Sequence, residues 1–276
     1  MLKPQLAPEE WEKEIDAFAR RLVAFGRMRR TVTTRVAVLR TFGREIGLSP
    51  GEVTEDVIIN WASQKQWKPE TRHSKYCTFR QFFHWYSVTH GIADPAADLP
   101  SVRRPIPPAR PIPEEVLAEA IQRADDRMKL ILRLAGSCGL RASEIAQVNR
   151  KDLCSDLFGP ALAVNGKGGR IRIVPLPGNL AEDIEQRSDP LTGYLFPGQH
   201  DGHLSPGYIS KLAAQFLPKT WTLHTLRHRC ATQAYRVNND LLTVQNLLGH
   251  ADVSTTQRYV RTAESGMRTA VEAIAI

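Results

Sequence analysis

A proline-rich stretch near the middle of the chain limits what the chain can fold into. The segment ADPAADLPSVRRPIPPARPIP, residues 93–113, contains seven prolines. Proline fixes φ and lacks a backbone N–H, so such a stretch stays extended and non-helical. At about 150 residues per domain, the chain of 276 residues is expected to form two domains. We assign residues 1–95 and 113–276 to these domains and residues 96–112 to the linker between them.

The first domain has the periodicity of amphipathic helices. It predicts four helices, over about 8–27, 31–46, 54–64 and 69–89, with Gly47 ending the second. We expect their apolar stripes to form the core. The stripes consist of Trp11, Ile15, Phe18, Leu22 and Phe25; Val32, Val36, Leu39, Phe42 and Ile46; Val57, Ile58 and Trp61; and Tyr76, Phe79, Phe82, Phe83 and Tyr86.

Arginines gather at the second of these helices and in the linker. The chain carries a formal charge of +8, which favours an anionic partner, with nucleic acid as the first candidate. We expect a phosphate-facing set, namely Arg29, Arg30, Arg35, Arg40 and Arg44, with Arg103 and Arg104 of the linker. A solvated surface and an inert spacer are the alternatives.

The second domain is predicted to be mostly helical, with one small sheet. Two β-rich runs, ALAV (161–164) and RIRIV (170–174), flank NGKGG (165–169), whose glycines suit a hairpin turn. The fold class is therefore mainly α with a small β-sheet. Helices are expected at about 114–123, 126–137, 141–148, 179–186, 206–217, 224–237 and 240–248, with a final pair over 254–274.

Composition excludes several classes of protein. With 42% hydrophobic residues the chain is too apolar to be disordered, and no run of about 18 apolar residues could cross a membrane. The start, MLKPQLAPEEWEKE, turns acidic where a signal peptide has an apolar core. We expect a cytoplasmic protein. The cysteines are far apart and form no C-x-x-C, which argues against a zinc ribbon or a disulfide framework: Cys77, Cys138, Cys154 and Cys230.

Two short blocks of the second domain carry residues suited to phosphate binding. GLRASEI (139–145) places Arg141 at a helix start, with Glu144 on the same face, where its carboxylate can orient the guanidinium. HTLRHRCAT (224–232) presents His224 and Arg227 about one helical turn apart. Each block alone is weak, because surface salt bridges share this spacing.

The remaining candidates lie in the hairpin and near the end of the chain. Lys167 stands at the hairpin tip, where a mobile lysine can donate a proton. LGHADVSTTQRYV (248–260) puts His250 in a turn and Tyr259 in a helix that Ser254 can cap. Zinc binding by His224 with His228, four residues apart, is disfavoured because the segment lacks the glutamate of a metalloprotease helix.

The order of these residues is more specific than any one block. Arginine, hairpin lysine, His-x-x-Arg, Gly-His and tyrosine together resemble the tyrosine recombinase (phage integrase) family, including the Xer recombinases. The resemblance covers about residues 113–262 and also suits a helical first domain. It implies an N-terminal helical core-type DNA-binding domain and a C-terminal catalytic domain. The expected form is the two-domain one, without the arm-binding domain of many phage integrases.

The resemblance also implies a role for each candidate residue. Tyr259 would be the nucleophile, and Arg141 and Arg227 would hold the nonbridging oxygens of the scissile phosphate. Lys167 would protonate the departing 5′-oxygen. The two histidines would assist proton transfer (His224) and hydrogen-bond the phosphate (His250), while Glu144 stands behind the first arginine. Cations oppose the charge of the transition state, so neither metal nor cofactor is needed.

The implied activity is site-specific recombination through a 3′-phosphotyrosine and a Holliday junction. The expected partners are double-stranded DNA core sites and a homotetramer formed on DNA, with an accessory directionality factor as a further candidate and no membrane. We expect integration and excision of phage or mobile-element DNA. The alternatives are Xer-like dimer resolution, a catalytically silent DNA-binding regulator and a metal-dependent nuclease. The apolar end, residues 265–276, is expected to dock on a neighbouring protomer or on its own domain.

Overall fold

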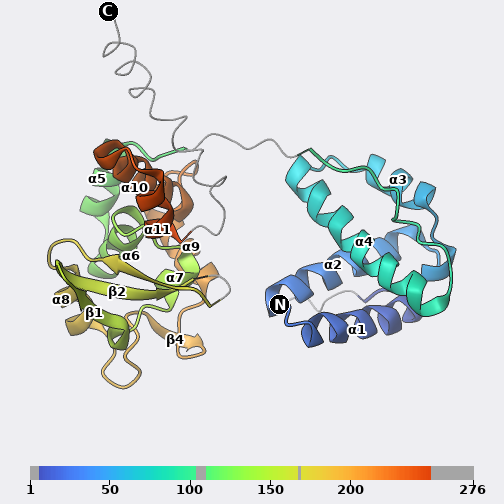
Figure 1. Ribbon diagram of the computed structural model, residues 1–276, viewed down its shortest axis with the longest axis horizontal. Coiled ribbons are helices and arrows are strands. Elements are labelled where there is room, and N and C mark those ends of the chain that lie inside the picture. Colours follow the sequence, from blue (N-terminus) through green and yellow to red (C-terminus); the bar gives the residue numbers. More distant parts are fainter. Residues whose placement is uncertain (1–5, 104–109, 167–168, 250–276) are drawn as a thin grey trace, which may run out of the picture. The chain divides into compact units, whose positions relative to one another are not determined.

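The computed structural model describes residues 6–103, 110–166 and 169–249 (Figure 1). The chain is mainly helical with a small antiparallel sheet, which confirms the predicted fold class. It divides into two compact units, with the division between residues 105 and 106. The finer boundaries, 1–95, 96–112 and 113–276, stay a prediction. None of the described helices is both long enough and apolar enough to span a membrane.

Unit 1 contains the four predicted helices within a few residues of their expected ends. They are α1 (Glu9–Ala24), α2 (Arg29–Ile46), α3 (Glu55–Ser63) and α4 (Pro69–His90), with a short 3₁₀ turn, η1 (Pro50–Glu52). Gly47 ends α2 in the left-handed conformation, as a helix-terminating glycine does.

The aromatic stripes form the core of unit 1. Trp11 of α1 is fully buried, stacks on Phe82 with ring centroids 5.6 Å apart, and donates from Nε1 to the carbonyl of Leu48 at 2.8 Å. Gly43 of α2 permits this packing, because a Cβ there would lie 2.7 Å from the Trp11 ring. The expectation for Phe25 was wrong. Helix α1 ends at Ala24, so Phe25 lies beyond the stripe and is 63% exposed.

The described ends of the linker pack onto the units they join. Leu99 is buried in the core of unit 1, and Arg80 Nη2 donates to the carbonyls of Leu99 (2.6 Å) and Pro100 (3.0 Å). Ile112 is buried in the core of unit 2. Both ends are therefore held by side-chain packing.

Unit 2 combines helices with a three-stranded sheet. The described helices match the predicted segments, except that the one expected to reach residue 148 ends at Ala146. The final pair predicted over 254–274 lies outside the described residues. Two strands, β1 and β4, were not predicted, because each has only four residues and no clear alternation. The elements are α5 (Glu114–Arg123), α6 (Asp126–Gly136), α7 (Ala142–Ala146), η2 (Arg150–Asp152), β1 (Leu153–Asp156), β2 (Gly159–Asn165), β3 (Ile171–Pro175), α8 (Leu180–Arg187), β4 (Pro197–His200), α9 (Pro206–Phe216), α10 (Leu223–Asn238) and α11 (Leu241–Leu248).

The sheet has the order β1-β2-β3, and both pairs are antiparallel. Leu162 of β2 pairs with Val174 of β3, and both side chains are buried in the core. Because residues two apart share a face, Arg172 lies on the face of Val174, while Ile171 (71% exposed) and Ile173 (50%) lie on the other. Helix α10 packs on α6, α11 contacts both α10 and β3, and α7 packs on α9 (Figure 1).

Candidate active site

Arg141 lies where the chain turns from α6 into α7. Gly139 precedes it with a φ of +65°, a conformation that favours glycine. Arg141 itself is the extended N-cap residue of α7. Its backbone N–H and its guanidinium both donate to Glu144, at 2.9 Å and 2.7 Å. The predicted contact between these residues is present, and its role in orienting Arg141 stays a prediction.

Glu144 is the buried acidic centre of the site, with its side chain only 3% exposed. Besides Arg141, its carboxylate accepts from both terminal nitrogens of Arg172, at 3.0 Å and 2.8 Å. Burial alone would raise the pKa of Glu144, but the hydrogen bonds from Arg172 and from the Arg141 backbone outweigh it. The pKa is therefore lowered, and Glu144 is a carboxylate at neutral pH.

Sequence reasoning missed Arg172. Its side chain is 10% exposed, and its Nε donates to the carbonyl of Leu247 at 2.9 Å, which ties β3 to the end of α11. A Cβ on Gly249 would lie 2.9 Å from Cδ of Arg172, so the two residues are in close contact. The only available signal was a charged residue inside the β-rich run RIRIV.

Arg227 reaches the same centre from α10. Its side chain is 2% exposed and donates to the carbonyls of Gly139 and Leu248, the latter at 2.6 Å. Its Nη1 lies 3.8 Å from the Glu144 carboxylate. The structure therefore brings Arg141, Glu144 and Arg227 together, although more than 80 residues separate the two arginines in sequence.

We call these four residues, Arg141, Glu144, Arg172 and Arg227, the arginine cluster. Since guanidinium groups stay protonated, three cations face one carboxylate, a formal excess of 3 − 1 = +2. A hollow of about 880 Å³ lies beside the cluster and is lined by Arg141, Arg170 and Arg172 with Gly249. None of its described lining residues is acidic. The hollow is suited to an anion.

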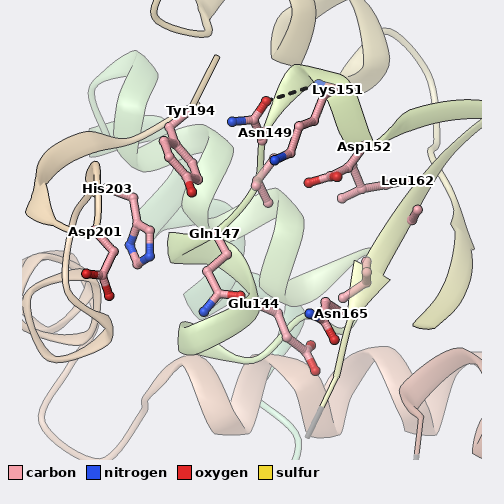
Figure 2. A pocket seen from close by; sticks show the side chains of 13 residues that line it. Glu144, Gln147, Asn149, Lys151, Asp152, Leu162, Asn165, Tyr194, Asp201 and His203 are labelled. Atoms are coloured by element: carbon pink, nitrogen blue, oxygen red, sulfur yellow. Dashed lines mark hydrogen bonds between the residues drawn. The ribbon is translucent and has the colours of Figure 1, made fainter. Parts of the chain in front are cut away.

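A second cavity, of about 330 Å³, is lined by Glu144 and by Asn165 at the end of β2 (Figure 2). Tyr194, Asp201 and His203 line another side of it, and Lys151 donates its backbone N–H to Asn149 Oδ1 at 3.1 Å. Its lining contains three carboxylates, Glu144, Asp152 and Asp201, and one lysine, Lys151, so it lacks the positive excess of the larger hollow.

His224 is exposed on the first turn of α10. Its Nε2 lies 3.0 Å from Nε2 of His228, which is buried. In the described part of the chain, no three His, Cys, Asp or Glu side chains gather as a metal site would require.

Two cysteines are buried beside the cluster: Cys138, just before GLRASEI, and Cys230, within HTLRHRCAT. Burial raises the pKa of Cys138 to about 12 and that of Cys230 to about 11, so both are neutral thiols. Cys230 Sγ donates to the carbonyl of Ser137 at 3.3 Å. Cys77 and Cys154 are free as well.

Several predicted residues lie outside the described ranges. They are Lys167, His250, Tyr259, Arg104 and the terminal segment 265–276. Their roles stay predictions. The turn beside Lys167 is described in part: Gly169 has a φ of +77°, and Gly166 N–H donates to the carbonyl of Arg170 at 2.8 Å.

The predicted DNA-facing arginines have different surroundings. Arg29, Arg30 and Arg103 are exposed. Arg40 binds Glu12 with both Nε and Nη2, at 2.7 Å for the shortest contact, and Arg35 donates to Gln81. Arg44 also has a partner. Phosphate binding by this set stays a prediction. Among the arginines of α2, Arg29 and Arg30 are exposed and the others are half-buried.

Residues 112–265 match the family model of the phage integrase family, which is more than half of the chain. The chain belongs to the phage integrase family of tyrosine recombinases. Tyrosine recombinase XerC of Chromobacterium violaceum is 32% identical over 202 residues, 66% of each chain. XerC of Mesorhizobium japonicum is 41% identical over 145 residues, 48% of this chain and 46% of that protein. XerC of Erythrobacter litoralis is 34% identical over 214 residues, 69% and 68% of the two chains.

This phage integrase family member spans about half to two thirds of the length of the curated relatives it matches. Solved structures show the same fold. A lambda integrase dimer bound to a COC' core site aligns with a TM-score of 0.70 at 18% identity, over 90% of this chain and 76% of that one. XerH bound to a palindromic difH substrate aligns with a TM-score of 0.69 at 18% identity, over 87% and 78%.

Proposed function

We propose that this protein is a site-specific DNA recombinase that cleaves and rejoins DNA through a 3′-phosphotyrosine intermediate. The arginine cluster and its hollow carry the proposal. During phosphoryl transfer the phosphate gains negative charge, and fixed guanidinium groups stabilise that charge most in the transition state. Membership of a tyrosine recombinase family supports Tyr259 as the nucleophile of this reaction.

In the proposed cleavage step, the phenol oxygen of Tyr259 bonds to phosphorus and the bond to the 5′-oxygen breaks. Tyr259 gives its proton to a nearby base, a transfer that His224 assists, and Lys167 gives a proton to the departing oxygen. Arg141 and Arg227 hold the nonbridging oxygens. The product keeps a phosphodiester between tyrosine and the 3′ end, so a free 5′-hydroxyl can reverse the reaction without ATP.

The two histidines complete this proposed set of catalytic residues. His224 assists proton transfer, and His250 hydrogen-bonds the phosphate. Glu144 acts through its neighbours: its carboxylate holds Arg141 and Arg172 in place. The reaction uses the charge of arginine and lysine side chains, and no metal enters the proposed step.

We extend the proposal to the assembly and its role. Double-stranded DNA core sites would be the substrate, and four protomers would exchange strands through a Holliday junction inside the cell, where the DNA lies. A lambda integrase tetramer bound to a Holliday junction shares this fold, with a TM-score of 0.68, which supports the proposal. The proposed role is integration and excision of phage or mobile-element DNA, with an accessory factor setting direction.

The test requires a DNA site, which selection from randomised duplexes would supply. A duplex with that site and a nick near the cleavage position would then be incubated with protein in EDTA and run on a denaturing gel. We expect a covalent protein–DNA band for the unchanged protein and none for Tyr259→Phe. Tyr208→Phe, which changes an exposed tyrosine of α9, is the control that should keep the band.

End labels add the polarity of the linkage. A label at the 5′ end of the cleaved strand should stay with the protein, because the protein is attached to the 3′ phosphate of that fragment. Binding without a band would favour the silent regulator, and a band that needs a divalent metal would favour the nuclease.

Similarity to XerC proteins favours dimer resolution as a second candidate role. Sequencing of the genomic DNA that becomes covalently attached in cells would separate the two roles. Attachment at the ends of a mobile element supports integration, and attachment at one chromosomal or plasmid site supports resolution.

A further inference from the structure

The buried His228 has no role in the reaction proposed above, but its contacts give it one. It lies one turn after His224 on α10, and its two ring nitrogens have different partners. Nδ1 accepts from the backbone N–H of Arg110 at 3.1 Å, and Nε2 lies 3.0 Å from Nε2 of His224. The two rings are in contact, with centroids 4.3 Å apart.

The first partner fixes where His228 carries its proton. A backbone N–H can only donate, so Nδ1 of His228 must offer a lone pair. The proton of the neutral imidazole is then on Nε2, which makes Nε2 the donor toward His224.

The contact between the two Nε2 atoms also fixes the position of the proton on His224. Because His228 donates at Nε2, Nε2 of His224 must accept, and the neutral ring of His224 carries its proton on Nδ1. A proton on Nε2 of His224 would point two N–H groups at each other across 3.0 Å.

We propose that His228 is a positioning residue that holds His224 in the Nδ1–H tautomer, and that the backbone N–H of Arg110 in turn holds His228. His224 then faces its surroundings with a donor at Nδ1. The catalytic meaning of this tautomer rests on the function proposed above; the tautomer itself does not.

The anchoring of Arg110 makes its N–H a fixed donor. Its guanidinium carbon lies 5.7 Å from the ring centre of Trp221, and Ile112, two residues on, is buried in the core of unit 2. Arg110 is the third-last residue of the predicted linker. The hydrogen bonds from Arg110 to His228 and from His228 to His224, which we call the relay, therefore connect the end of the linker to His224. A histidine held in the wrong tautomer can lower a catalytic rate by as much as about 10⁴-fold.

Two pairs of variants separate this relay from simple packing. His228→Gln keeps a donor nitrogen at the same distance along the side chain, whereas His228→Leu fills similar space without a donor. Arg110→Pro deletes the backbone N–H in a segment already rich in proline, whereas Arg110→Ala keeps the N–H and removes the guanidinium.

The experiment is ¹⁵N–¹H NMR of ¹⁵N-histidine-labelled full-length protein at about pH 8, where free imidazole is neutral. Long-range spectra show which ring nitrogen is protonated, and loss of signals in His224→Gln and His228→Leu assigns the two rings. We expect His224 to carry its proton on Nδ1 in the unchanged protein, His228→Gln and Arg110→Ala. In His228→Leu and Arg110→Pro, the Nε2–H form of His224 should appear.

Cleavage of the nicked duplex would give the functional consequence. We expect His228→Leu to cleave about 10- to 100-fold more slowly, as when a hydrogen-bonded partner that orients a metal-bound histidine is lost, with His228→Gln close to the unchanged protein. A proton on Nε2 of His224 in the unchanged protein, or an unaltered His224 tautomer in both His228→Leu and Arg110→Pro, would overturn the proposal. Because the spectra need no DNA, failure of the recombinase proposal would leave them unaffected.

Discussion

At the residue scale, Glu144 organises the site by compensating charge that would otherwise be buried alone. Arg172 and Arg227 have little access to water, and burying an unpaired guanidinium costs several kcal/mol. One carboxylate in contact with three arginines allows these cations to stay close together. Their excess positive charge remains available for an anion.

Arg172→Ala should destabilise unit 2 by about 3 kcal/mol, because it removes a partner of a buried carboxylate. The measurement is the free energy of unfolding from urea titration followed by circular dichroism. Arg187→Ala is the matched control: it breaks an exposed ion pair with Asp126, which should contribute far less to stability. Similar losses in the two variants would show that Arg172 does not stabilise Glu144.

The lowered pKa of Glu144 predicts a pH dependence. Its pKa in the folded protein is below the ordinary value of 4.5, so its stabilising contribution is complete above that value. The contribution is lost as the pH falls through the folded-state pKa, where the carboxylate becomes protonated. The unchanged protein should therefore be more stable than Glu144→Gln at pH 7, and this advantage should shrink in acid. Urea titrations of both proteins from about pH 7 to pH 3 test this; a constant difference would contradict it.

At the element scale, the turn between α6 and α7 depends on Gly139. Its positive φ costs an alanine about 1–2 kcal/mol, and a Cβ would lie 2.7 Å from Leu248 Cδ2 at the end of α11. Gly139→Ala should therefore lower the free energy of unfolding by about 1–3 kcal/mol more than the backbone penalty alone. Gly178→Ala is the control, with a φ of +58° and no atom within 4 Å of a Cβ. If urea titration gave the same loss of unfolding free energy for both variants, the turn would accommodate the added methyl group without strain.

The elements that sequence predicted well are those whose pattern is local. The helices of unit 1 follow from stripes such as Trp11, Ile15 and Phe18, which recur at helical spacing within one segment. Strand β1 has no such pattern and exists because Leu153–Asp156 pairs with β2. In RIRIV the two isoleucines are exposed, and Arg172 lies on the face of the buried Val174. Contacts with Glu144 and Leu247, far away in the chain, explain the orientation of Arg172.

At the scale of the whole molecule, DNA binding should be strongly dependent on salt. If basic residues of α2 and the linker contact phosphates, affinity should fall by orders of magnitude between about 50 and 200 mM salt. The double variant Arg29→Ala/Arg30→Ala should reduce the slope of log affinity against log salt by about 2, one for each lost phosphate contact. Fluorescence anisotropy with a labelled duplex measures the affinity at each salt concentration.

The control is Arg123→Ala, which changes an exposed arginine of unit 2 paired with Glu119 and should leave the slope unchanged. A flat salt response of the unchanged protein would contradict phosphate contact.

The sequence by itself determined the fold class, the helices, the hairpin and the family, because helical periodicity, turn glycines and motif order are all encoded over short stretches of chain. It also indicated Arg141, Glu144, His224 and Arg227 as candidates. Only the tertiary structure decided that Arg172 joins this cluster and that Arg40 pairs with Glu12. It alone showed that His228 lies between His224 and the linker. These are contacts between segments distant in sequence, and no local pattern specifies which buried charges will meet.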